Sequence, residues 1–221
     1  MTDSSLAGLW GLSRAQATAL AQHCKASGAR RGELIARRGA QLPGVFVVVS
    51  GTVKLSLRST EGDERVLRIV AAGEPFGEPT ALLGKPCLYD AVALTDAKLL
   101  SVPAQAIFTL LTRDQRFARR MVVALAERSF GILAEFAAAT TQRGAQRLAG
   151  YLESLLAREG TTDSSTVQLP VSKTVVAARL GMKKETLSRL LRQFATEGII
   201  DVSRREIAIR DRVRLAATAH A

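Results

Sequence analysis

The sequence predicts an α+β chain in three consecutive parts: an antiparallel β-roll, one long helix and a winged helix-turn-helix. Three patterns predict this order. Short β-branched stretches separated by glycine turns fill residues 30–102. Apolar residues then recur at helical spacing over 116–140. Two helices joined by a glycine turn and followed by two short strands are expected within 171–211.

The roll is expected from a series of short strands in the domain 1–112, which also holds helices at its N-terminus. The β-branched run 45–49 ends at a Ser-Gly pair, and 52–57 alternates apolar and polar residues. Gly62 marks a turn, because glycine accepts positive φ without steric cost. The segment 73–77 is rich in glycine and interrupts the strands. Further strands are expected at 65–70, 89–94 and 98–102, which together favour a small antiparallel roll.

A long helix is expected over 113–140, after helical residues that begin at Pro103, which suits a first helical turn. About 25 residues is longer than a small domain needs to cover its core. We therefore expect the helix to pair with its copy in a homodimer. The alternative is that its apolar face packs against the roll. The apolar residues at helical spacing are Phe117, Met121, Ala124, Leu125, Ile132, Leu133 and Phe136.

The third part, 141–221, is expected to begin with a helix over 143–159 and a strand over 167–169. Helices follow over 173–180 and from Lys183 to about Phe194, joined by a turn at Gly181. Two helices joined by such a turn form a helix-turn-helix, a DNA-binding motif. Strands over 199–202 and 206–210 then form a β-hairpin wing with a basic tip.

One face of the second helix carries side chains that can read DNA bases. Glu185, Ser188 and Arg189 share a helical stripe, whereas the apolar residues lie on the other side. Arginine can donate two hydrogen bonds to guanine, and glutamate can accept one from cytosine. The alternative is a solvated face in which Glu185 pairs with Arg189. Around the stripe we expect contacts to the DNA backbone from Lys173, Lys183, Lys184, Thr186, Arg192, Arg204 and Arg205.

The composition agrees with a polyanionic partner. The 221 residues include 31 Lys and Arg against 20 Asp and Glu, a formal net charge of +11. Such a chain commonly binds nucleic acid, although a solvated basic surface would have the same charge. A hydrophobic fraction of 47% excludes a disordered chain.

The beginning of the sequence lacks the pattern of a signal peptide, and no run of about eighteen apolar residues predicts a membrane helix. We expect a cytoplasmic protein with no membrane partner. Two cysteines exclude a disulfide framework and are too few for a four-cysteine iron–sulfur site. Two histidines leave little room for a metal site, and none is expected.

The chain resembles the Crp/Fnr family of transcriptional regulators over essentially its whole length. The resemblance rests on Gly51-Thr-Val-Lys-Leu55, Gly73-Glu-Pro-Phe-Gly-Glu78, Glu185-Thr-Leu-Ser-Arg189 and Glu197-Gly-Ile-Ile200. It implies that the roll is a jelly roll like those that bind cyclic nucleotides and that it senses an effector. The Glu-x-x-Ser-Arg spacing resembles the Fnr branch, whose dimers bind palindromes of TTGAT half-sites. Carried over by position, Glu185, Ser188 and Arg189 are the base readers.

The region from Leu169 to Ile209 resembles the Dnr type, regulators that respond to nitric oxide through haem. The resemblance places a candidate effector pocket at Gly77, Glu78, Tyr89 and Asp90. Members that bind cyclic AMP carry an Arg-Ser or Arg-Thr pair where this sequence has Tyr89 and Asp90. Because an aspartate repels a phosphate, cyclic AMP is disfavoured, and Glu78 can then be a simple turn-end residue.

An iron–sulfur cluster of the Fnr kind is also disfavoured, because Cys24 stands alone where that branch has a cysteine cluster. Haem with nitric oxide or carbon monoxide stays open, since it needs only one or two axial ligands. His23 is the first candidate ligand, Cys87 the next and His220 the weakest. The simpler interpretations are an exposed polar histidine at 23 and a small buried residue at 87. A small metabolite, or no effector, is also open.

These inferences favour a homodimeric DNA-binding regulator that is not an enzyme and has RNA polymerase as a further partner. One alternative is a cyclic-nucleotide-binding module or adaptor whose winged domain contacts proteins. A haem- or metal-dependent enzyme is a third interpretation. The sequence assembles no acid–base or nucleophile constellation to support it.

Overall fold

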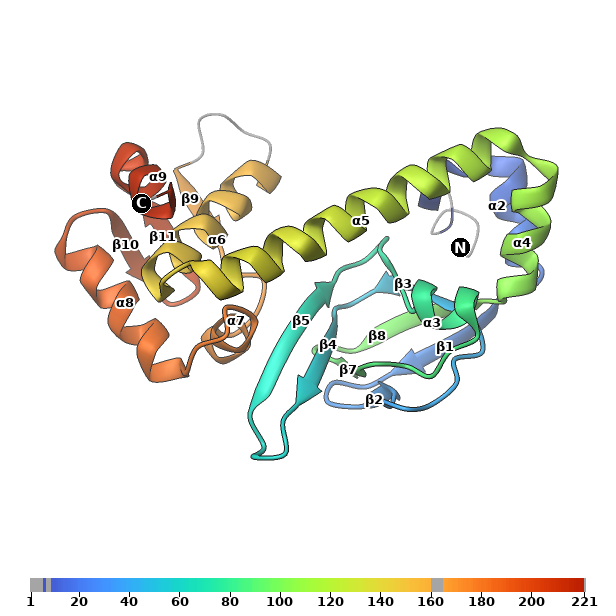
Figure 1. The fold of residues 1–221 in the computed structure, drawn as a ribbon, viewed down its shortest axis with the longest axis horizontal. Coiled ribbons are helices and arrows are strands. Elements are labelled where there is room, and N and C mark those ends of the chain that lie inside the picture. The colour runs from blue at the N-terminus through green and yellow to red at the C-terminus, as the bar shows by residue number, and fades with distance from the viewer. Residues whose placement is uncertain (1–5, 7–8, 160–164, 221) are drawn as a thin grey trace. The chain divides into compact units, whose positions relative to one another are not determined.

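The computed structural model describes residues 6, 9–159 and 165–220. The chain forms two compact units, 1–130 and 131–221, and their boundary lies within the long helix α5, Gln115–Thr141 (Figure 1). The predicted α+β class is confirmed, whereas the finer division at residues 112 and 140 stays a prediction. Among the described residues, no helix has the length and apolar character needed to span a membrane.

The N-terminal unit contains two four-stranded antiparallel sheets (Figure 1). The first has the order β1-β8-β3-β6, formed by Lys25–Ala29, Ala97–Val102, Val45–Ser50 and Pro75–Phe76. The second has the order β2-β7-β4-β5, formed by Leu34–Ala36, Asp90–Ala93, Val53–Arg58 and Glu64–Val70. The predicted strands are present, and β1, β2 and β6 are additions that the sequence pattern did not indicate.

Strand β3 is buried on both faces, which explains its unbroken run of apolar residues. Val45 and Val47 pack into the core shared with the helices, whereas Phe46 and Val48 pack between the two sheets. The ring of Phe46 stacks on that of Phe76 at a centroid distance of 5.2 Å. One strand thus joins both cores of the unit.

Helices complete the N-terminal unit. They are the 3-10 turn Leu9–Gly11 (η1), α2 (Arg14–Ala21), α3 (Glu78–Leu83), α4 (Ala104–Arg113) and the first part of α5. Asp114 separates α4 from α5, because its carboxylate accepts hydrogen bonds from the backbone N–H groups of Phe117 and Arg116. These bonds and one from Gln16 lower the pKa of Asp114. The edge of the Trp10 ring contacts Phe117, which anchors the start of α5.

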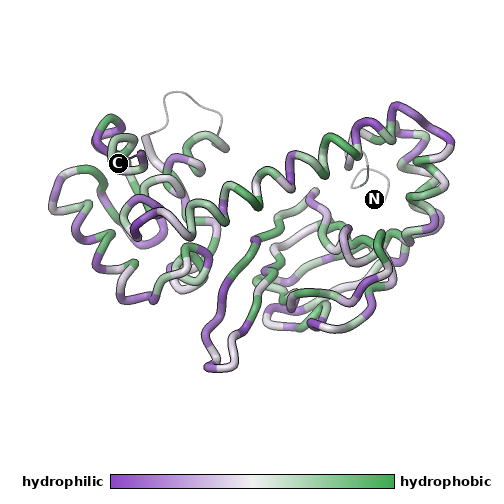
Figure 2. The backbone as a smooth tube through the Cα atoms, viewed as in Figure 1, coloured by the Kyte–Doolittle hydropathy of each residue, from purple (hydrophilic) through white to green (hydrophobic). Residues whose placement is uncertain are grey.

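The apolar residues expected along α5 lie in two different surroundings, and in the first half the alternative of packing within the N-terminal unit holds. Phe117 and Met121 are buried in the core of the N-terminal unit, where Ala124 and Leu125 pack against them. The second half remains exposed, with Leu133 at 66% and Phe130 at 76% of their full accessibility. Figure 2 shows apolar and polar segments alternating along this helix. One face of the first half therefore covers a core, whereas the large apolar side chains of the second half are open to another partner.

The C-terminal unit is a winged helix-turn-helix. It contains α6 (Gly144–Glu159), α7 (Lys173–Arg179), α8 (Lys184–Thr196) and α9 (Arg212–His220). Its antiparallel sheet has the order β10-β11-β9, formed by Ile200–Ser203, Glu206–Ile209 and Thr166–Gln168. Lys183 is the N-cap of α8 and does not open the helix as expected.

Candidate functional site

The turn between α7 and α8 fixes the orientation of the second helix. The Ser172 hydroxyl accepts a hydrogen bond from the backbone N–H of Val175 and caps α7. Gly181 has a φ of 63°, a left-handed conformation that favours glycine. Met182 N–H then donates to the carbonyl of Ala177 and closes the turn. Helix α8 is held on this turn by four buried side chains, those of Leu187, Leu190, Leu191 and Phe194.

The opposite face of α8 is open. Glu185, Ser188 and Arg189 are all exposed, as the helical spacing predicted. Within the described part of the chain, no ion pair joins Glu185 to Arg189, so both side chains are available to a ligand. The three polar groups lie in the first turns of the helix, the part that enters the major groove when such a helix docks on DNA.

Basic side chains surround this face. Arg204 and Arg205 form the two-residue loop of the β10–β11 hairpin, since Ser203 pairs with Glu206. Arg204 adopts a φ of 53°, which is uncommon for a residue with a side chain and turns the hairpin sharply. Lys173 and Thr186 are half-buried, whereas the exposed members of the predicted backbone set are Lys183, Lys184, Arg192, Arg204 and Arg205.

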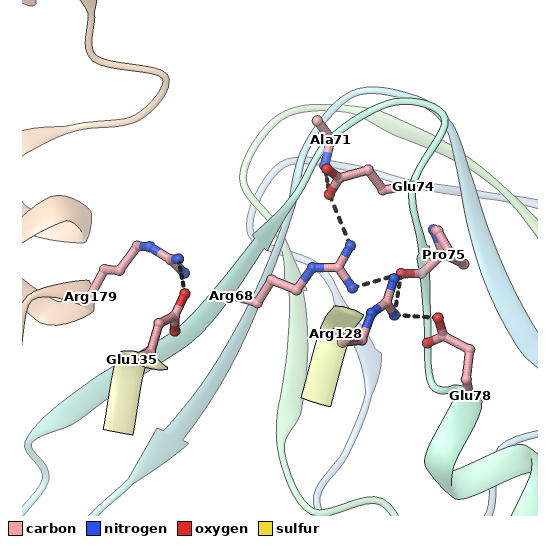
Figure 3. Close-up of polar contacts among 8 residues, drawn as sticks. All are labelled: Arg68, Ala71, Glu74, Pro75, Glu78, Arg128, Glu135 and Arg179. Carbon is pink, nitrogen blue, oxygen red and sulfur yellow. Dashed lines mark hydrogen bonds and ion pairs between the residues drawn. The ribbon is translucent and has the colours of Figure 1, made fainter. Parts of the chain in front are cut away.

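A second polar cluster lies in the N-terminal unit, around the start of α3. Glu78 is only 1% exposed and forms an ion pair with Arg128 of α5. Arg128 also lies 3.5 Å from the carbonyl oxygen of Pro75, to which Arg68 of β5 donates at 2.8 Å (Figure 3). Burial, together with the charge of Arg128, lowers the pKa of Arg68. Two guanidinium groups therefore converge on one carbonyl beside a buried carboxylate.

Three of the four residues of the predicted effector pocket meet in this cluster. Gly77 has a φ of 85°, and a Cβ there would lie 2.8 Å from the Leu42 side chain, so glycine is required. The Tyr89 hydroxyl is hydrogen-bonded to the Gly77 backbone, and burial, with Cys87 and Glu78 nearby, raises the pKa of Tyr89. Asp90, the fourth residue, has another partner: its carboxylate accepts a hydrogen bond from the backbone N–H of Arg38 at 2.8 Å.

The interpretation of Glu78 as a turn-end residue is wrong. Its carboxylate is buried and neutralised by an arginine fifty positions later in the chain. Sequence reasoning also did not single out Arg68 and Arg128. No local signal identifies them, since their roles come from the approach of β5 and α5 to the α3 turn.

The structure places the three candidate haem ligands in different surroundings. His23 is exposed at the end of α2, and Cys87 is buried with its thiol donating to the Tyr89 carbonyl. His220 lies in the other unit, 3.9 Å from Glu153. Burial raises the pKa of Cys24 to about 11, so this thiol is protonated at neutral pH. Among the described residues, no group of three or more His, Cys, Asp or Glu side chains could hold a metal ion.

The two parts of the chain match known families. Residues 29–114 match the cyclic nucleotide-binding domain, and residues 146–218 match the Crp-like helix-turn-helix domain. The nitrogen fixation regulation protein FixK of Azorhizobium caulinodans is 31% identical over 178 residues, which cover 77% of this chain and 69% of that protein. The chain belongs to the Crp/Fnr family of transcriptional regulators.

Two further proteins are similar to this chain at lower identity. The CRP-like cAMP-activated global transcriptional regulator of Mycobacterium tuberculosis is 24% identical over 191 residues, covering 86% of this chain and 85% of that one. The structure of FixK2 from Bradyrhizobium japonicum shares the fold, with a TM-score of 0.78 and 23% identity over 90% of this chain and 98% of that chain. This Crp/Fnr regulator therefore combines an effector-binding domain with a DNA-binding helix-turn-helix.

Proposed function

We propose that this Crp/Fnr regulator acts in the cytoplasm as a homodimer that binds a palindrome of TTGAT-like half-sites. The observation that carries the proposal is the face of α8, where Glu185, Ser188 and Arg189 are exposed above a buried apolar side. In this proposal the three side chains read base edges, and the surrounding basic residues contact phosphates. The regulator performs no chemistry of its own, and RNA polymerase is its further partner.

Dimerisation is proposed through the exposed half of α5. Phe130 and Leu133 are exposed, and they lie three residues apart, the spacing between two core positions of a coiled coil. Side chains of this size are seldom left in water on one continuous stripe unless a partner covers them. A second copy of the same helix presents the complementary stripe, as a two-fold dimer requires.

For the effector, we propose that it acts at the cluster of Gly77, Glu78 and Tyr89. A cyclic nucleotide is disfavoured there because Tyr89 and Asp90 stand where the nucleotide-binding members place the arginine pair. In addition, Arg128 already neutralises Glu78. An effector would control DNA binding by favouring one arrangement of α5 in the dimer.

Binding to short duplexes tests the proposal directly. Fluorescence anisotropy would compare a TTGAT palindrome with a scrambled duplex of the same composition, at several salt concentrations. We expect the palindrome to bind at least about 100-fold more tightly than the scrambled duplex. Equal affinity for the two duplexes would overturn sequence-specific recognition and favour a winged domain that contacts proteins.

Replacing Arg189 should reduce affinity and discrimination together. Arg189→Ala is expected to lose about 1–3 kcal/mol on the cognate palindrome and to relax the preference at one base pair in each half-site. The measurement is anisotropy against every single-base variant of the half-site. Gln193→Ala is the matched control, because Gln193 lies on the same helix and its amide donates to Glu197. An equal loss on cognate and scrambled duplexes would show that Arg189 contacts phosphate only.

Replacing Arg204 should act on all sequences alike. Arg204→Ala is expected to weaken cognate and scrambled binding by a similar factor, because the wing tip contacts phosphate. The slope of log affinity against log salt should become about one unit shallower. A change in base preference in the same series of duplexes would instead assign the wing to a groove.

A further inference from the structure

The joint between α5 and α6 is short and closely defined. Helix α5 is followed by Gln142, whose N–H donates to the Ala138 carbonyl, and α6 begins at Gly144. Arg143 N–H donates to the Gln146 side chain at 2.5 Å, which caps the new helix. Only two residues thus connect the long helix to the winged domain. Because hydrogen bonds hold both of them, the chain changes direction at a defined angle.

Arg147, on the first turn of α6, connects the ends of two other helices. Its Nε donates to the carbonyl of Leu180, the C-cap of α7, at 2.9 Å. Its Nη1 donates to the carbonyl of Gln142, directly after α5. Carbonyls at helix C-termini have no partner within the helix and carry partial negative charge. The rigid fork of a guanidinium can satisfy both carbonyls at once, whereas an ammonium group lacks this planar geometry.

Two further contacts fix the same joint. Arg179 of α7 forms an ion pair with Glu135 of α5 at 2.5 Å, seen at the left of Figure 3. A Cβ at Gly144 would lie 3.3 Å from Leu190 of α8 and 3.7 Å from Met182, so the start of α6 packs closely on the buried face of the second helix. The end of α5 is therefore bound to α7, and the start of α6 packs on α8.

We propose that Arg147 is a positioning residue for DNA recognition, which sets the angle between α5 and the helix-turn-helix. This inference rests on the proposed binding of a palindrome by a homodimer. Both α8 helices of such a dimer must enter the major groove about 34 Å apart, one helical turn of DNA. A change in the angle at the joint would therefore change the distance between the two α8 helices, although Arg147 itself contacts no DNA. Its loss should therefore reduce the coupling between the two half-sites and leave recognition of each half-site intact.

The test measures binding of Arg147→Met and Arg147→Lys to a palindrome, to a single half-site and to palindromes whose spacer is changed by one base pair. For Arg147→Met we expect palindrome affinity to fall about tenfold, within the range that coupling residues reach. Binding to the single half-site should stay within about twofold, and the preference for the cognate spacer should weaken. Arg147→Lys should show the same pattern to a smaller extent. Arg143→Met is the matched control, because Arg143 is exposed beside the joint.

Two results would overturn the inference. Palindrome affinity equal to that of the unmodified protein would show that the angle does not depend on Arg147. A parallel loss on half-site and palindrome in both variants would show that Arg147 only stabilises the winged domain. If the unmodified protein bound palindrome and scrambled duplexes equally, the proposed function would fail first, and the inference would fail with it.

Discussion

Leu133→Asp should make the protein monomeric and weaken its binding to the palindrome by at least about 100-fold. The side chain is 66% exposed, so the substitution removes little packing within the chain. In a dimer it would place two carboxylates opposite each other in an apolar seam, where burying unpaired charge is costly. Once the dimer is lost, the second half-site no longer binds at the high effective concentration that the first provides.

Light scattering and anisotropy together measure this effect. The mass in solution should fall from that of two chains to that of one, while affinity for a single half-site duplex stays within about twofold. Ala139→Asp provides the control, because it introduces the same charge on an exposed position of α5 away from the stripe of Phe130 and Leu133. A dimer that survives Leu133→Asp would assign the oligomeric contact to another surface.

The face of α8 could be predicted because helical spacing alone determines it. Glu185, Ser188 and Arg189 share a stripe in any regular helix, and the apolar residues between them fix which side is buried. The short strands of the roll were predicted for a similar reason, since alternation and β-branched runs are local patterns. In both cases the information lies within a few neighbouring residues.

Elements that depend on a distant partner were not predicted. Strand β1 consists of Lys25-Ala-Ser-Gly-Ala29, which is mostly exposed and has little β propensity, and it is a strand only because it pairs with β8. Helix α3 is short and contains a proline, so no periodicity indicates it. For α5, spacing alone could not decide between pairing with a copy and packing against the roll, and the first half of the helix covers the core of one unit.

The contacts of Arg147 and Arg128 also depend on distant partners and were not predicted. Arg147 contacts Leu180, thirty-three positions away, and Arg128 contacts Glu78, fifty positions away. Neither arginine lies in a recognisable local motif, and this basic sequence contains many other arginines in similar sequence contexts. Tertiary structure alone selects which of them are buried and paired, and so which of them have a structural or positioning role.

Removing Arg128 should destabilise the N-terminal unit substantially. Arg128→Ala leaves the Glu78 carboxylate buried without its ion-pair partner, and removing one partner of a buried pair typically costs about 3–5 kcal/mol. We expect a value near the low end, about 3 kcal/mol, because the Arg128 side chain is 26% exposed and part of its charge is screened. Glu78→Gln should cost less, since the arginine left behind can reach solvent and still contact the Pro75 carbonyl.

A double variant separates the effect of the unpaired Glu78 charge from the effect of losing the Arg128 side chain. Adding Glu78→Gln to Arg128→Ala should recover part of the lost stability, because a buried amide is easier to accommodate than a buried unpaired carboxylate. Urea unfolding followed by tryptophan fluorescence reports this unit specifically, since Trp10 is the single tryptophan of the chain and packs on Phe117. A double variant less stable than Arg128→Ala alone would mean that the Glu78 carboxylate stabilises the unit even without Arg128, so the loss would not come from unpaired buried charge. An effector could then not act by competing for the charge of the Arg128–Glu78 pair.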